Sequence, residues 1–448
     1  MPRYSGRFNR VKSQGWDTSF DMDVLCVYFF WSYFDFHRLF HRWTSLKGKF
    51  PESIFELAAQ KLCGAEWFKP YDRNQAFAVL AQRFCLDIAF GHRDAVSFVE
   101  ASIASRLRVC IKTTEDRIWS YSTYPSEPLL SCAAASLLLG DASPMQHNLD
   151  LTLDTLKNMV NDGVVDIGQI GELVGRFIWL LAKDIFVRSS MPKVSKFDEK
   201  LQDCQLVSVV DYLEFVFGPR FWTDNGAAQE EFQDAYINFS HWISMDYNIR
   251  RDEEGLEQLP YVTCSIFFFF NTNLKYSIEK WTLCHWERTS AVQCCHDQPL
   301  IDKVIPMYFR NRSDGASGVS QILISDKARI NSQKSGLKDI RRDHPSIAPG
   351  YRGLPYIAIL TDLGADNKTS ELEVALDSSS DRDTCLRIHA PGLDAARYSF
   401  LTKRDKMTEI LVDLYKRQSA PSSSSHLQNL QDQVQFGASS EPCHMNLK

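Results

Sequence analysis

The spacing of apolar residues changes along the chain, and this change constrains the fold more than any other feature. Between residues 51 and 250, apolar side chains recur every three to four positions, which is the period of an amphipathic helix. The clearest stripe lies in QIGELVGRFIWLLAKDIFVR and consists of Ile170, Leu173, Val174, Phe177, Ile178, Leu181 and Ile185. After about residue 262, short apolar runs bounded by polar or turn residues replace the stripes. The sequence therefore predicts an α+β, mixed fold.

The first half is predicted to be a mostly helical domain covering residues 51–250. PESIFELAAQKLC opens it with Ser53 three residues before Glu56, the spacing of a capping box. Further helices are predicted in FAVLAQRFCLDIAF, AVSFVEASIASRLRVCI, LLSCAAASLLLG, LVSVVDYLEFVFGP and EEFQDAYINFSHWI. No fixed repeat period is found, so a regular solenoid is not supported.

The second half, residues 265–417, is predicted to be a small α/β domain with a mixed sheet. A helix in LKYSIEKWTLCHWERT precedes five strands, which are predicted in AVQCC, VIPMYF, QILIS, YIAIL and CLRIH. GADNKTSELEVALDSSSDRD is interpreted as a polar linker, and KMTEILVDLYKR as the final helix. Residues 1–50 show no clear period and are assigned no function, and the Ser-rich residues 418–448 are typical of a disordered tail.

Composition excludes several classes of protein. The apolar fraction of 44% and the charged fraction of 24% are typical of globular proteins, so a largely disordered chain is excluded. The net charge of −6 gives no global attraction to nucleic acid or anionic membrane, so such binding needs a local basic patch. The apolar run Val24–Phe36 is too short to cross a bilayer, so no membrane partner is expected. Twelve scattered cysteines without a CxxC pair indicate reduced thiols in an intracellular protein, cytoplasmic or nuclear.

Two charged residues border neighbouring predicted strands. Asp302 comes just before VIPMYF, and Lys327 follows QILIS. The order helix, strand, strand, strand, later strand, helix, with these residues on the second and third strands, resembles the core of the PD-(D/E)xK nuclease superfamily. The resemblance covers about residues 270–417. In that family a helix acid, a strand-two aspartate and a third-strand E-x-K or Q-x-K serve Mg²⁺-dependent phosphodiester cleavage.

The resemblance implies a role for individual residues. Asp302 matches the strand-two aspartate, Lys327 matches the lysine, and Glu287 or Glu279 supplies the helix acid, so Asp302 and Glu287 would be the metal ligands. Ser325 stands where the family carries the acid of E-x-K, and a hydroxyl is a weaker ligand than a carboxylate. The implied catalytic set is therefore degenerate and inactive or crippled, and Mg²⁺ is implied only if the site works.

Strand geometry decides whether Asp326 could replace the missing acid. Successive side chains alternate between the two faces of a strand, so Asp326 should face away from Ser325 and Lys327. An ordinary interpretation also stands beside the nuclease one, because apolar strands commonly end in Asp or Lys where they meet water. A basic segment follows and either lines a phosphate backbone or is solvated surface: Lys327, Arg329, Lys334, Lys338, Arg341 and Arg342.

A wider resemblance covers most of residues 51–365. It rests on segments such as QRFCLDIAFGHRDAV, YPSEPLLSCAAA, DAYINFSHWI and QPLIDKVIPMYF. Together these are similar to a multicopy family of uncharacterised proteins in mushroom-forming fungi. The third-strand motif of that family more often resembles I-Q-x-K, which makes Ser325 an outlier. The resemblance implies no activity.

Other motifs carry little chemistry. CHWERTSAVQCCH contains zinc-type ligands, but their spacing fits neither a finger nor a ribbon. The glycines of DGVVDIGQIGELVG do not fit GxGxxG, and no GxxxxGK[ST], HExxH or GxSxG occurs.

Two hypotheses about the function remain. One is a degenerate nuclease-like protein that binds nucleic acid. The other is a non-enzymatic interaction or scaffold protein, which a large exposed apolar patch on residues 51–250 would favour.

Overall fold

The structure is a computed structural model, and it describes the chain in segments. These are residues 52–63, 72–88, 93–113, 119–124, 126, 128–139, 146–166, 172–190, 202–244, 278–294, 300–311, 318–327, 336–341, 354–365, 371–378, 384–402 and 404–419. The N-terminal segment 1–50 and almost all of the expected tail lie outside them.

Helices dominate the first half, as the apolar stripes predicted. They are α4 (Glu52–Cys63), α5 (Arg73–Phe84), α6 (Arg93–Ser105), α7 (Pro128–Leu139), α8 (Gln146–Asn161) and α9 (Glu172–Ser190). Two small antiparallel sheets accompany them: β1 (Asp87–Ile88) with β4 (Val165–Asp166), and β2 (Val109–Thr113) with β3 (Trp119–Thr123). A capping box starts α5, where the Asp72 side chain accepts a hydrogen bond from the Gln75 backbone N–H.

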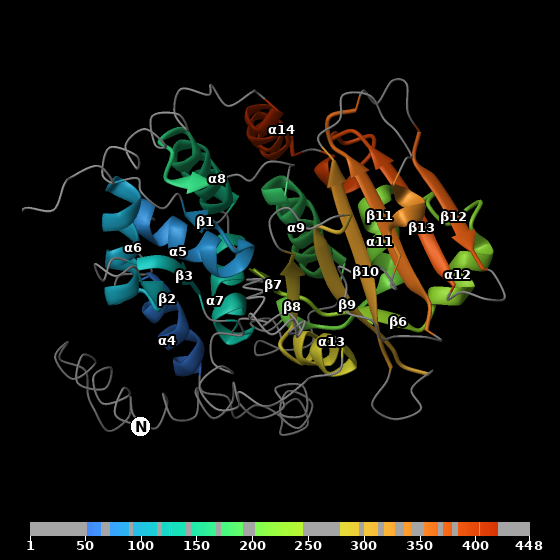
Figure 1. Cartoon of the computed structure of the whole chain (residues 1–448), viewed down its shortest axis with the longest axis horizontal. Coiled ribbons are helices and arrows are strands. Elements are labelled where there is room, and N and C mark those ends of the chain that lie inside the picture. Colours follow the sequence, from blue (N-terminus) through green and yellow to red (C-terminus); the bar gives the residue numbers. More distant parts are fainter. Residues whose placement is uncertain are drawn as a thin grey trace, which may run out of the picture.

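A nine-stranded mixed sheet forms the other half of the molecule (Figure 1). Its strands are β5 (Val207–Ser208), β6 (Ala235–Ile237), β7 (His241–Ser244), β8 (Ser290–Gln293), β9 (Lys303–Phe309), β10 (Val319–Lys327), β11 (Tyr356–Asp362), β12 (Glu373–Asp377) and β13 (Cys385–Pro391). β8, β9 and β10 pair antiparallel in succession, and β10, β11 and β13 pair parallel. The five strands predicted in the second half are thus confirmed as β8, β9, β10, β11 and β13.

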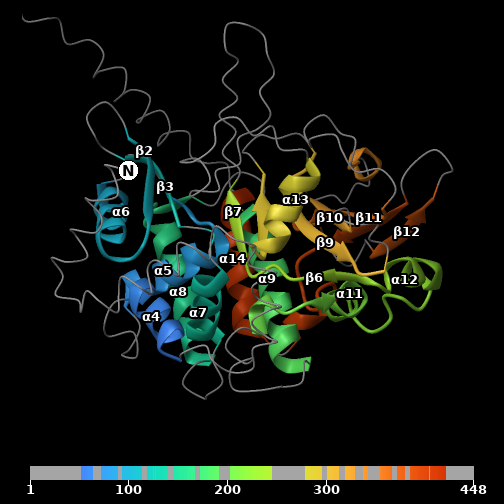
Figure 2. The same cartoon turned by 90° about the horizontal axis from the view of Figure 1, so that it is seen from below.

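Helices cover both faces of the sheet. Figure 2 shows α13 (Ile278–Glu287) on one face and α9, α11 (Val209–Phe217) and α14 (Asp405–Ser419) on the other. Along β10, Ile322 and Ile324 enter the main core, which runs from Ala58 to Tyr415. Leu323 enters a smaller core on the α13 face. None of the helices in the described segments is long and apolar enough to cross a membrane.

The α+β class is confirmed, but the expected domain boundary near residue 250 is not what the structure shows. β6 pairs with β9 and β7 pairs with β8, so residues 207–244 contribute to the same sheet as residues 290–391. EEFQDAYINFSHWI, predicted as one helix, forms the end of α12 (Gly226–Phe232) and then β6 and β7. Strand pairing overrides the helical spacing there. The expected polar linker contains β12, which pairs with β13 at the end of the sheet path.

Candidate functional site

Asp302, Ser325 and Lys327 meet where β9 begins and β10 ends, and we call these three residues the sheet-edge site. The antiparallel pairing of Lys303 with Ile324 brings the two strand ends together. The Lys327 ammonium nitrogen lies 3.9 Å from a carboxylate oxygen of Asp302. The Ser325 hydroxyl donates to the same oxygen at 3.3 Å, and the Asp326 backbone N–H donates to it at 2.6 Å. The strand register therefore gathers three of the predicted site residues.

Asp326 points to the opposite face, as the alternation along a strand predicts. Its carboxylate pairs with the Lys303 ammonium, and it accepts a hydrogen bond from the Thr361 hydroxyl at 2.6 Å. Both members of the Lys303–Asp326 pair are fully buried beneath α9. A Cβ atom on Gly175 of α9 would lie 2.8 Å from the Lys303 nitrogen, so glycine allows the helix to approach the pair.

The two faces are balanced in charge because the sequence places an acid beside a lysine on each strand. Asp302 and Lys327 share the α13 face, whereas Lys303 and Asp326 share the α9 face. Burial raises the pKa of Asp302, although Lys303, Lys327 and the Ser325 hydroxyl oppose the shift. Burial also lowers the pKa of Lys303 to about 8. Each buried charge thus depends on its partner on the neighbouring strand.

Glu287 is placed far from the sheet-edge site. It is the last residue of α13, next to Trp286, whose ring stacks on Tyr308 at 5.4 Å between centroids. Tyr308 lies six residues along the strand direction from Asp302, roughly 20 Å away. Since α13 runs antiparallel to β10, with Thr282 bonded to Gln321 at 2.8 Å, its end points away from Asp302. The expected grouping of Glu287 with Asp302 is therefore corrected. Glu279 is in the first turn of α13, and its side chain lies outside the described residues.

A second pair of polar residues lies at the same edge and was missed in the sequence. Asp362 ends β11 and is the register partner of Lys327. Because Thr361 bonds to Asp326 on the α9 face, Asp362 faces the same side as Lys327. The His389 Nε2 atom lies 2.9 Å from an Asp362 carboxylate oxygen, which orients the imidazole. The signal available in the sequence was an acid two residues after the predicted strand YIAIL, at the edge where open sheets bind ligands.

The residues at this edge do not fit Mg²⁺. Within the described segments, no group of three or more His, Cys, Asp or Glu side chains is placed to hold a metal ion. The sheet-edge site offers one carboxylate, whose negative charge is already shared with Lys327, and a serine hydroxyl. For the zinc-type motif, His285 is buried and bonded through Nδ1 to the Ser290 hydroxyl at 2.9 Å. Cys295 and His296 of that motif lie outside the described residues.

The basic segment is only partly described. Lys338 is exposed and Arg341 is half-buried, and Arg329, Lys334 and Arg342 lie outside the described residues. Lys338 belongs to the short helix η3 (Leu337–Asp339), which is held against β13 because the Arg387 guanidinium donates to the Leu337 carbonyl at 2.8 Å. The segment therefore returns to the sheet near the start of β13, whose third residue is Arg387.

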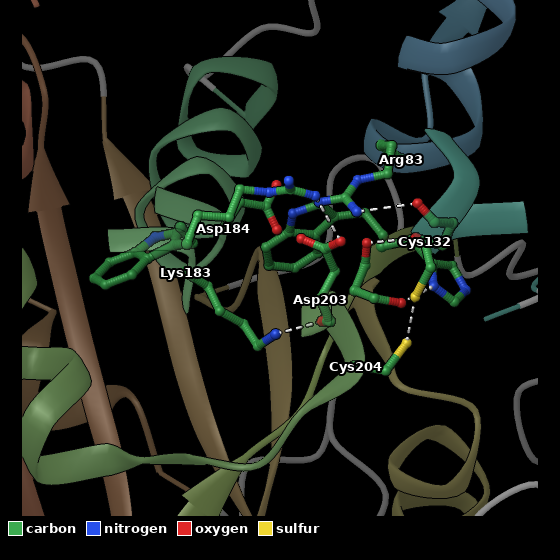
Figure 3. A network of polar contacts seen from close by, with 12 residues as sticks. Arg83, Cys132, Lys183, Asp184, Asp203 and Cys204 are labelled. Atoms are coloured by element: carbon green, nitrogen blue, oxygen red, sulfur yellow. Dashed lines mark hydrogen bonds and ion pairs between the residues drawn. The ribbon is translucent and has the colours of Figure 1, made fainter. Parts of the chain in front are cut away.

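A buried network of polar residues lies between the helical half and the sheet (Figure 3). It consists of Arg83, Cys132, Lys183, Asp184, Asp203 and Cys204, all of them fully or almost fully buried. The residues come from α5, α7, α9 and the short helix η1 (Gln202–Cys204). No motif in the sequence pointed to it, because its members are far apart along the chain and each stands in an ordinary apolar context.

Comparison with known proteins finds a family match for part of the chain. Residues 72–273 are similar to a family described as "Domain of unknown function (DUF8736)". No curated protein and no solved structure matches the chain. The matched range contains every member of the buried network and none of the three residues of the sheet-edge site.

Proposed function

We propose that the chain is a nuclease-like protein whose sheet-edge site binds the phosphate backbone of a nucleic acid and cuts it poorly or not at all. The observation that carries the proposal is the meeting of Asp302 and Lys327 on one face, with Ser325 between them. The PD-(D/E)xK resemblance implies this relation between the strand-two aspartate and the lysine of E-x-K. The order α13, β8, β9, β10, β11 also follows the order that the resemblance implies.

Weak cleavage is expected because the sheet-edge site retains few groups that could bind Mg²⁺. Mg²⁺ prefers oxygen ligands with negative charge, and the third-strand position that would supply a second carboxylate is Ser325. The remaining carboxylate, Asp302, already accepts hydrogen bonds from Ser325 and the Asp326 backbone and pairs with Lys327, so less of it is available to a cation. Without a well-held cation, neither the attacking water nor the phosphorane charge is stabilised.

Binding of a nucleic-acid phosphate backbone is attributed to Lys327. The Lys327 side chain is 21% exposed, so its ammonium group can reach a phosphate at the molecular surface. The exposed Lys338 belongs to the same basic segment. Binding of this kind is electrostatic, independent of base sequence, and weakens as salt rises.

Fluorescence anisotropy with labelled single-stranded DNA, double-stranded DNA and RNA tests the proposal. Lys327→Ala should weaken binding and reduce the slope of log affinity against log salt by about 1, because one phosphate contact is lost. Lys406→Ala is the matched control. It removes another exposed lysine, which pairs with Asp154 at 2.7 Å on α8, and should leave the slope unchanged.

Two outcomes would contradict the proposal. If Lys327→Ala binds all three nucleic acids like the wild type, with the same salt slope, the sheet-edge site does not bind a phosphate backbone. If the wild type cuts them rapidly with Mg²⁺ or Mn²⁺ and Lys327→Ala abolishes the cleavage, the site is an intact nuclease centre rather than a degenerate one.

The alternative of an interaction protein gains no support from the described surface. Within residues 51–250, the single large apolar side chain that is exposed in the described part is Leu151, at 39%. That is not the extended apolar patch of a partner surface. Cys63, Cys132 and Cys204 are reduced thiols, which supports placing the protein in a reducing compartment, the cytoplasm or the nucleus.

A further inference from the structure

Two cysteines from distant parts of the chain meet inside the buried network. The Cys132 and Cys204 sulfur atoms are 3.0 Å apart, although 72 positions separate the residues in the sequence. Cys132 lies on α7, and Cys204 is the last residue of η1. Figure 3 shows the two sulfur atoms pointing toward each other. The separation exceeds the length of a disulfide bond, about 2.05 Å, by roughly 1 Å.

Charged side chains hold the residue that precedes each cysteine. Arg83 donates to the Ser131 carbonyl at 3.1 Å and pairs with Asp184 on α9. Asp203 pairs with Arg188 at 3.0 Å, and its carbonyl accepts a hydrogen bond from Lys183 at 2.6 Å. Both backbones next to the sulfur atoms are therefore fixed, and the close approach of the thiols is built into the network.

The two thiols differ in their surroundings. The Thr289 hydroxyl lies 3.5 Å from the Cys204 sulfur and is itself bonded to the Ser240 hydroxyl at 2.9 Å. Burial raises the pKa of Cys204, but contacts with Cys132, Thr289 and Ser240 and the charge of Lys183 outweigh it, so the net pKa is lowered. Burial and the contact with Cys204 raise the pKa of Cys132 well above its ordinary value. Cys204 is thus the more acidic thiol of the pair, and Cys132 is the less acidic one.

We propose that Cys132 and Cys204 form a dithiol that a small peroxide oxidises to an intramolecular disulfide. The Cys204 thiolate attacks a peroxide oxygen, the O–O bond breaks, and a sulfenic acid forms while hydroxide leaves. The Cys132 sulfur then attacks the Cys204 sulfur, and the sulfenic oxygen leaves as water with the thiol proton. Overall, two thiols and hydrogen peroxide give one disulfide and two waters.

Burial selects the oxidant. Both cysteine side chains are almost completely inaccessible, with exposed fractions of 0% for Cys132 and 3% for Cys204. Hydrogen peroxide is small enough to reach them during local opening, whereas glutathione disulfide is not. The disulfide ties α7 to η1, which leads directly into β5, so oxidation links the helical half to the sheet. The modification is independent of the function proposed for the sheet-edge site.

Peptide mapping of the full chain tests the inference. Trypsin releases Cys132 in residues 118–157 and Cys204 in residues 201–220, and each peptide contains one cysteine. Reduced protein treated with hydrogen peroxide, then unfolded and alkylated, should yield these two peptides joined, with a mass about 2 Da below their sum. Glutathione disulfide should yield neither the joined peptides nor a glutathione adduct on either cysteine.

Single-residue variants test whether the joined peptides require both Cys132 and Cys204. Cys63→Ser removes another buried thiol and should leave the joined peptides in place, whereas Cys132→Ser or Cys204→Ser should abolish them. The inference is overturned if peroxide-treated wild type yields both peptides separately and fully alkylated. It is also overturned if wild type unfolded in urea before oxidation yields the joined peptides in equal amount, because the folded network would then contribute nothing.

Discussion

At the scale of single residues, two adjacent pairs organise the edge of the sheet. Asp302 and Lys303 at the start of β9, and Asp326 and Lys327 at the end of β10, place one acid and one lysine on each face. Strand alternation was enough to predict the opposite directions of Asp326 and Lys327 from the sequence. The Lys303–Asp326 pair could not be predicted, because its burial depends on α9, more than a hundred residues earlier in the chain.

Gly175→Ala tests the buried pair at this scale. A methyl group at Gly175 would collide with the Asp326 carboxylate and the Lys303 ammonium, and both of these side chains are fully buried. We expect a loss of about 2–4 kcal/mol in the free energy of unfolding, measured by urea denaturation. Gly226→Ala is the control, since a Cβ atom there meets nothing within 4 Å, and it should change stability by less than about 0.5 kcal/mol. Equal effects of the two substitutions would show that the pair is not confined by α9.

At the scale of elements, the sequence predicted which helices and strands form better than it predicted how they run relative to one another. The five short apolar runs became strands because each is bounded by polar or turn residues. The direction of α13 relative to β10 depends on contacts such as Trp286 with Tyr308, which no local pattern encodes, so Glu287 was placed wrongly. The helical spacing in EEFQDAYINFSHWI was misleading, because the apolar residues of β6 and β7 serve two faces of a sheet.

The junction between α13 and β8 predicts a pH dependence. His285 bonds to Ser290 across this junction, and burial, aided by Arg288, lowers the pKa of His285 from 6.5 to about 3. Below pH 6.5 the unfolded chain therefore binds a proton at His285 that the folded chain does not. Stability should fall as pH falls from about 6.5 toward 3, by about 1.4 kcal/mol per pH unit for this histidine.

His285→Asn isolates that contribution from other titrating groups. Asp184, whose pKa is raised to about 6 chiefly by burial, acts in the opposite sense between pH 6 and 4. The free energy of unfolding of wild type and variant can be measured by urea denaturation at several pH values. Contributions that both proteins share, such as that of Asp184, cancel in the difference between them. The difference in stability between them should shrink as pH falls through this range. A difference that stays constant with pH would contradict the buried, neutral state of His285.

At the scale of the whole molecule, one sheet joins the two expected domains. Because β6 and β7 pair with β9 and β8, and one core runs from Ala58 to Tyr415, the parts should unfold together. Urea unfolding followed by tryptophan fluorescence and by far-UV circular dichroism should give coincident transitions. A fragment of residues 51–250 lacks the partner strands and should show no cooperative transition. Two separate transitions, or a cooperatively folded fragment, would contradict a single folding unit.

The sheet-edge site is the central claim, and calorimetric titration of Mg²⁺ into Ser325→Glu tests it most directly. The Ser325 hydroxyl lies 3.3 Å from the Asp302 carboxylate on the same face, so glutamate there would supply a second acid beside it. We predict measurable Mg²⁺ binding by Ser325→Glu, none by wild type at the same concentrations, and loss of the new binding in Asp302→Asn/Ser325→Glu. A correctly folded Ser325→Glu protein that binds no more Mg²⁺ than wild type would contradict the assignment.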